Sequence, residues 1–316
     1  MLELAVEALV QTAVFLARVV PFMAGGIFLM EVLVELGWID RMARLTLPLT
    51  RAAHLCDEVG VSFLTAFGSP SAANAILRRM YDGGHIDERE MMVGAVMNSF
   101  PSVVTHWRTM IPVLIPLLGW HGLVLILLLT IAGLMKTSII MLYGRLTLVG
   151  RGRCTPPSSS QRRSLDGREA AGVALARTIS ALRRILKLMV PISILVFFLI
   201  GAGIFNMLSE SLHFVQPYLP IPNEGLPIVA TQLASQFGAY IIAGGLLDNG
   251  VLTGEEVVLT LLVGKVLTVV GILRTYMPYY LGIFGPAQGM KILLVSMGLR
   301  ALTLTLVAGV YYVLAF

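Results

Sequence analysis

The sequence predicts an all-α integral membrane protein made of two inverted repeats, each with about three spanning helices and one broken, re-entrant hairpin. Composition is the first reason: of 316 residues, 57% are hydrophobic and 13% charged, about half the charged share of a soluble domain. The second reason is that several apolar runs reach the roughly 20 residues that cross a bilayer as a helix, without the alternation of a membrane barrel. An internal repeat is the third.

The repeat has a constant spacing. Arg108 and Arg274 lie 274 − 108 = 166 positions apart, and each is followed directly by Thr and, four positions on, by Pro. Gly119 and Gly285 have the same spacing. An internal duplication of this kind is the sequence signature of many secondary transporters.

Within each repeat the elements follow the same order. An apolar segment comes first, interrupted by Pro21 in one repeat and by Pro191 in the other. A broken hairpin follows, because Pro70 and the glycine before it fall in an apolar run and interrupt a helix. Its counterpart is residues 231–247, where we expect the break near Gly238. Two spanning helices complete each repeat.

A polar linker, residues 151–172, divides repeat 1 (residues 1–150) from repeat 2 (residues 173–316). The linker is rich in Arg, and basic loops stay on the cytoplasmic side. Repeat 1 carries further arginines on its interfacial stretch and hairpin, whereas residues 188–264 contain no Lys or Arg. These arginines are Arg41, Arg44, Arg51, Arg78, Arg79 and Arg89. We therefore predict a multi-pass plasma (inner) membrane protein with a cytoplasmic linker, both termini outside and inverted halves.

One stretch carries a family resemblance. Residues 67–119, FGSPSAANAILRRMYDGGHIDEREMMVGAVMNSFPSVVTHWRTMIPVLIPLLG, resemble the central motif of membrane proteins with a nucleoside-recognition, or Gate, domain. Residues 231–258, TQLASQFGAYIIAGGLLDNGVLTGEEVV, resemble a weaker second copy. The resemblance implies kinship with concentrative nucleoside transporters, the membrane core of ferrous-iron transporters and spore-maturation proteins. It does not imply a substrate.

Cations without acidic neighbours are the main functional signal. No acidic residue lies between Glu90 and Asp166, and none follows Glu256. These stretches nevertheless contain Arg108, Lys136, Lys265, Arg274 and Arg300. Ionisable groups in membrane helices are functional candidates by default, although long basic side chains also extend to the interface. We expect some of them to face a cavity that binds a small anionic solute.

Polar residues beside the helix breaks complete the predicted site, since free N–H groups at helix amino termini favour anions. The predicted substrate-binding residues are Arg108, Arg274, Ser69, Ser71, Asn74, Asn98, Ser99, Ser235, Gln236, Lys136 and Arg300. His106 is left out because its counterpart is Ile272.

These observations predict a secondary transporter that moves an organic anion, or a phosphate-bearing or nucleoside-related solute, by alternating access. We expect no enzymatic activity, cofactor or nucleic-acid partner, because the phosphate-binding, nucleophile-elbow and dinucleotide motifs are missing. The coupling ion, H⁺ or Na⁺, and a homodimeric assembly stay open. One alternative is a permease resembling the ferrous-iron transporter, with His54, Cys56 and Asp57 as metal ligands. Another is a membrane scaffold that transports nothing.

Overall fold

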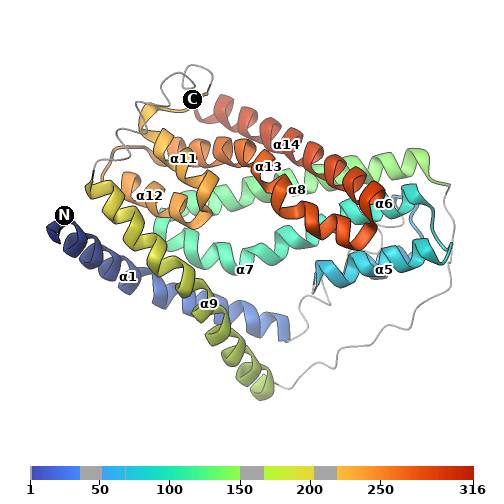
Figure 1. The fold of residues 1–316 in the computed structure, drawn as a ribbon, viewed down its shortest axis with the longest axis horizontal. Helices are drawn as coiled ribbons and strands as arrows, with labels where there is room; N and C mark the ends of the chain where they lie inside the picture. Colours follow the sequence, from blue (N-terminus) through green and yellow to red (C-terminus); the bar gives the residue numbers. More distant parts are fainter. Residues whose placement is uncertain (1, 36–51, 68, 150–166, 203–218) are drawn as a thin grey trace.

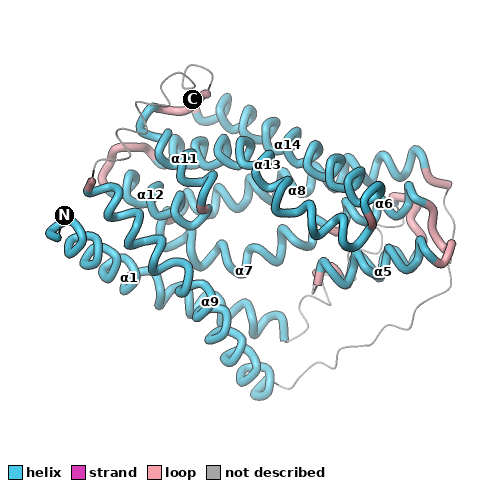
Figure 2. Tube along the Cα trace, viewed as in Figure 1, coloured by secondary structure: helices cyan, strands magenta, loops and turns pink. Residues whose placement is uncertain are grey.

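The computed structural model describes residues 2–35, 52–67, 69–149, 167–202 and 219–316. In this part of the chain the protein consists of helices and connecting loops, with no strand (Figure 2). The longer helices are α1 (Leu2–Glu35), α4 (Asp57–Thr65), α5 (Pro70–Asp82), α6 (Glu88–Met97), α7 (Ser99–Leu118), α8 (Trp120–Thr147), α9 (Gly167–Gly201), α11 (Leu226–Ala234), α12 (Gln236–Asp248), α13 (Gly254–Phe284) and α14 (Pro286–Ala315). A short 3₁₀ helix, η2 (Asn223–Gly225), precedes α11. The all-helical prediction is confirmed.

Part of the predicted linker, residues 151–166, lies outside the described residues, as do Arg41, Arg44 and Arg51. Helix α9 begins at Gly167, so the last residues of the predicted linker, 167–172, are helical.

Helix bounds recur at the spacing of 166 residues. Helix α12 begins and ends 166 positions after α5, and α14 begins 166 positions after α8. Positive φ angles also recur, at Gly84 and Gly250 and at Gly119 and Gly285. Only glycine adopts these left-handed conformations without strain. The turns after α5 and before α8 therefore each contain a glycine with positive φ, as do their counterparts after α12 and before α14.

A capping serine separates the two helices of each broken pair, α4 from α5 and α11 from α12. Ser69 and Ser235 have extended backbone, with φ −153° and −150°, and each side chain accepts a hydrogen bond from the backbone N–H three residues on, at 3.2 Å. Such N-caps satisfy part of the free donors at the start of a helix. Our expectation of a break near Gly238 is wrong by three residues, because the cap at Ser235 starts the helix and Gly238 lies buried inside it.

The two helix pairs lie at opposite ends of the molecule (Figure 1). The pair α4 and α5 lies at the right-hand end of the view, with α6, and the pair α11 and α12 lies at the left. Helices α8, α13 and α14 extend between the two ends, and α1 packs against α9 and α7 at one side.

Apolar residues on the outside of the long helices indicate a membrane protein. Helices α8 and α14 are the two in the described chain that are long and apolar enough to cross a membrane. At 1.5 Å per residue they extend about 42 and 45 Å. Their exposed side chains include Leu127, Leu142, Leu302 and Val310, whereas Lys136 on α8 is buried. Apolar side chains outside and a buried charged side chain are the distribution expected in a lipid bilayer, where charged groups face the interior of the bundle.

Candidate functional site

A cavity of about 500 Å³ lies between the two helix pairs, within the range of small-molecule sites. Residues before and after the predicted linker both contribute to its lining, from helices α5, α6, α7, α8, α12, α13 and α14. The amino termini of both broken helices reach it: Pro70 and Ser71 begin α5, and Gln236 begins α12. Because the N–H groups and dipole at a helix amino terminus favour negative charge, these termini add to the attraction for an anion.

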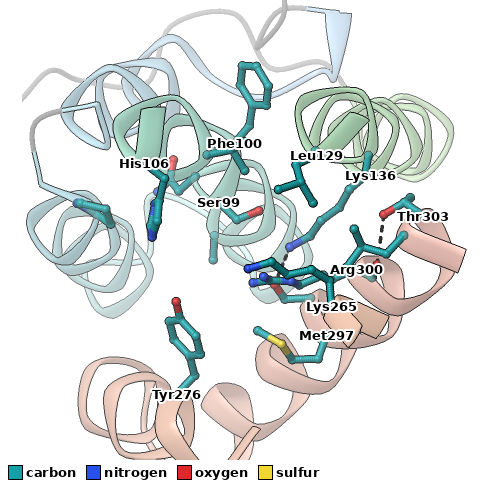
Figure 3. Close-up of a pocket in the computed structure, with 18 of the residues that line it drawn as sticks. Ser99, Phe100, His106, Leu129, Lys136, Lys265, Tyr276, Met297, Arg300 and Thr303 are labelled. Carbon is teal, nitrogen blue, oxygen red and sulfur yellow. Dashed lines mark hydrogen bonds between the residues drawn. The ribbon is translucent and has the colours of Figure 1, made fainter. Parts of the chain in front are cut away.

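Three cations line one side of this cavity. Lys136 comes from α8, Lys265 from α13 and Arg300 from α14, and Figure 3 shows their nitrogen atoms gathered together. Both lysines are buried, with 7% and 6% of their surface exposed. Lys136 Nζ donates to Ser296 Oγ at 2.8 Å, and Lys265 Nζ lies 5.6 Å from the centre of the Tyr240 ring.

The lining contains no Asp or Glu among the described residues. Buried like charges repel one another, and each loses its hydration, so an arrangement of this kind is unfavourable until an anion arrives. The electrostatics of the cavity therefore favour a negatively charged ligand.

An amide network borders the cavity next to α5. Asn98 Nδ2 donates to Asn74 Oδ1 at 3.0 Å and to Ser62 Oγ at 2.9 Å, and Asn74 Nδ2 donates to Tyr279 of the other repeat at 3.0 Å. Asn98 is also the residue at which α6 ends and α7 begins. Its buried Oδ1 has no hydrogen-bond partner in the described structure.

Aromatic residues line other parts of the cavity. Phe100, Trp107 and Tyr276 contribute to its lining, and Figure 3 shows Phe100 and Tyr276 on different sides of the open space, both away from the nitrogen atoms of the cations. Trp107 Nε1 donates to Thr130 Oγ1 at 3.1 Å, so the indole offers the cavity mainly its apolar ring.

The structure brings together most of the predicted site residues. Those that line the cavity are Ser71, Asn74, Asn98, Ser99, Gln236, Lys136 and Arg300. Ser69 and Ser235 act as helix caps beside it. Arg108 and Arg274 lie on α7 and α13, and their side chains are outside the described part of the structure.

Sequence reasoning left several lining residues out of the site. Lys265 was recognised as a membrane cation but not as a site residue. At the 166-residue spacing its equivalent position is Ser99, which was among the predicted site residues. His106 was left out because its counterpart is Ile272, yet it lines the cavity. The internal symmetry was a poor criterion here, because a binding site between two repeats needs no identical side chains. Ser296 and Tyr276 carried no sequence signal that we recognise.

Of the three alternative metal ligands, the described structure includes the side chains of His54 and Cys56. No group of three or more His, Cys, Asp or Glu side chains is placed to hold a metal there. His54 Nδ1 lies 3.1 Å from the Leu148 carbonyl oxygen. Cys56 is buried, and its backbone N–H donates to Glu90. The Asp57 side chain lies outside the described part.

A helical bundle with an apolar exterior and charged groups inside has the form of a membrane protein, and the comparisons agree. A family model described as nucleoside recognition (Gate) matches residues 16–121. The uncharacterized protein MJ1556 of Methanocaldococcus jannaschii is 30% identical over 302 residues, 96% of both chains. The chain therefore belongs to the nucleoside-recognition (Gate) family.

Two more relatives come from the same organism. The uncharacterized protein MJ0871 is 27% identical and MJ0880 is 23% identical, over 94% and 89% of this chain and 93% and 92% of theirs. No solved structure is a significant match. The family match contains Ser62, Asn74 and Asn98 of the amide network, whereas Lys136, Lys265 and Arg300 lie beyond residue 121.

Proposed function

We propose that the protein is a secondary transporter that binds a small organic anion in the central cavity and moves it by alternating access. The observation that carries this proposal is the convergence of Lys136, Lys265 and Arg300 in a cavity of about 500 Å³ whose described lining has no carboxylate. A scaffold needs no such cavity. A divalent cation would be repelled by it, which counts against a metal permease.

The architecture supports transport. Helix bounds and left-handed glycines recur at one spacing, and the two broken helix pairs lie at opposite ends of the molecule (Figure 1). Two repeats of opposite orientation account for both observations. In transporters of this kind, discontinuous helices meet the substrate at the interface of the repeats. We accordingly assign α4–α5 and α11–α12 as re-entrant hairpins, called hairpin 1 and hairpin 2 below.

The remaining features of the proposal follow from the sequence. We place the protein in the plasma membrane with the linker in the cytoplasm and both termini outside, following the distribution of basic residues. Because the chain contains no ATP-binding motif, the energy for concentrative transport would come from a gradient of H⁺ or Na⁺. No enzymatic step and no cofactor are part of the proposal.

Uptake into proteoliposomes tests the proposal. Purified protein should accumulate labelled organic anions from a small panel, and Arg300→Gln should reduce the rate at least about 10-fold, because a charge-assisted contact contributes about 1.5–3 kcal/mol. Arg145→Gln is the matched control, since Arg145 is exposed on α8 and does not line the cavity. Uptake of neutral solutes or divalent metals, unaffected by Arg300→Gln, would refute the proposal.

A further inference from the structure

The three cations of the cavity have more hydrogen-bond donors than the described protein uses. Lys136 gives one hydrogen bond, to Ser296. Neither the Lys265 ammonium nor the Arg300 guanidinium donates a hydrogen bond to a described residue, and Lys265 Nζ faces the ring of Tyr240 at 5.6 Å from its centre. Since an ammonium has three donors and a guanidinium five, about ten donors remain for a ligand.

The number of free donors distinguishes between anions. A carboxylate has two oxygens, which together accept about four hydrogen bonds. A phosphate monoester has three terminal oxygens and close to two negative charges at neutral pH. When both lysines are protonated, two ammonium groups and one guanidinium carry three positive charges, so a dianion compensates them better than a monoanion does and favours their protonated form. The cationic side is therefore matched to a tetrahedral dianion.

The size of the cavity requires more than an inorganic ion. Its volume of about 500 Å³ is that of a site for a small organic molecule. Phe100 and Tyr276 lie away from the cations in Figure 3, on two sides of the open space, and the ring of Trp107 adds apolar surface to the lining. The ligand consequently needs an apolar body next to its charged group.

We infer that the cavity binds a phosphate monoester with an apolar organic body, the phosphate at Lys136, Lys265 and Arg300 and the body against Phe100, Trp107 and Tyr276. This inference rests on the proposed function and narrows its substrate class. Phosphate monoesters occur as water-soluble metabolites and as lipid headgroups, and the cavity chemistry is the same for both.

Ligands that share one body test the inference. Isothermal titration of the detergent-purified protein should rank phenyl phosphate at least about 10-fold above benzoate and above inorganic phosphate, with benzyl alcohol not binding. Lys265→Gln and Arg300→Gln should each weaken phenyl phosphate binding about 10- to 100-fold, while Arg145→Gln leaves it unchanged. Benzoate binding as tightly as phenyl phosphate, or phenyl phosphate not binding, would overturn the inference. If a variant fails to fold, the ranking on the unchanged protein still decides.

A second arm separates the two sources of the phosphate monoester. In nanodiscs, phosphatidic acid should compete with phenyl phosphate if the ligand is a lipid and should not compete if it is water-soluble, with phosphatidylcholine as the reference lipid. Both results keep the phosphate monoester. The two proposals also fail separately. Uptake of anions without a preference for phosphate would support transport and overturn this inference. Tight binding of phenyl phosphate without uptake would support this inference and overturn transport.

Discussion

The two hairpins share a backbone but contact the rest of the protein by different means. Position 78 of hairpin 1 corresponds to position 244 of hairpin 2 at the 166-residue spacing. Arg78 Nη1 donates a hydrogen bond to the Phe284 carbonyl oxygen at 2.6 Å, at the end of α13. Gly244 instead lets α7 approach closely, since a Cβ at this position would lie 3.2 Å from the Leu117 carbonyl oxygen.

A second pair of equivalent positions shows the same difference. Asn74 donates to Tyr279, which belongs to the other repeat. Its counterpart Tyr240 accepts from Gln236 of its own helix at 2.6 Å, and its hydroxyl donates to Met110 Sδ of the other repeat at 3.4 Å. Hairpin 1 is thus tied to the opposite repeat by hydrogen bonds to oxygen, which water can replace. Hairpin 2 has one weak hydrogen bond to sulfur and is held mainly by close packing, which water cannot replace. We expect hairpin 1 to be the more mobile gate.

The largest expected effect concerns packing at hairpin 2. Gly244→Leu should lower the free energy of unfolding by about 2–3 kcal/mol, because the added side chain has to displace the backbone at Leu117. Thermal unfolding of the purified protein measures it. Gly245→Leu is the matched control, since a Cβ at Gly245 meets no atom within 4 Å. Equal losses in both variants would contradict the role of close packing.

A smaller effect is expected at Asn74. Asn74→Leu removes the contact with Tyr279 and takes away one partner of Asn98, and we expect a loss of about 1–2 kcal/mol. Hydrogen exchange should become faster in α5 and stay unchanged in α12. Tyr240→Phe is the comparison in hairpin 2, because it removes a hydroxyl that accepts from Gln236 of its own helix and donates to the weakly accepting sulfur of Met110. If Tyr240→Phe accelerates exchange in α5 as much as Asn74→Leu, the two hairpins are not independent.

The sequence predicted the helical fold because apolar composition and broken helices leave few alternatives in a membrane. Ser71 and Asn74 could be predicted to line the cavity because they lie just after a helix break. The position of the second break was harder, because Gly238 is the more obvious helix breaker, whereas the break depends on the Ser235 cap, a hydrogen bond that composition does not show. Lys265 and Ser296 meet Lys136 only through the packing of α8, α13 and α14, which no local pattern contains.

The smallest expected effect on stability is at Arg78, and it tests gate mobility most directly. Its side chain is 30% exposed and also pairs with Asp82, so Arg78→Ala should cost at most about 1 kcal/mol. Hydrogen exchange at the carboxyl-terminal end of α5 should nevertheless accelerate, since hairpin 1 loses its bond to Phe284. Arg79→Ala removes a neighbouring exposed arginine for which the described structure gives no side-chain hydrogen bond or ion pair, and it should leave exchange unchanged. Slower exchange in Arg78→Ala, or equal acceleration in both variants, would mean that hydrogen bonding to α13 does not restrain the hairpin, and the proposed difference between the two gates would then depend on Asn74 alone.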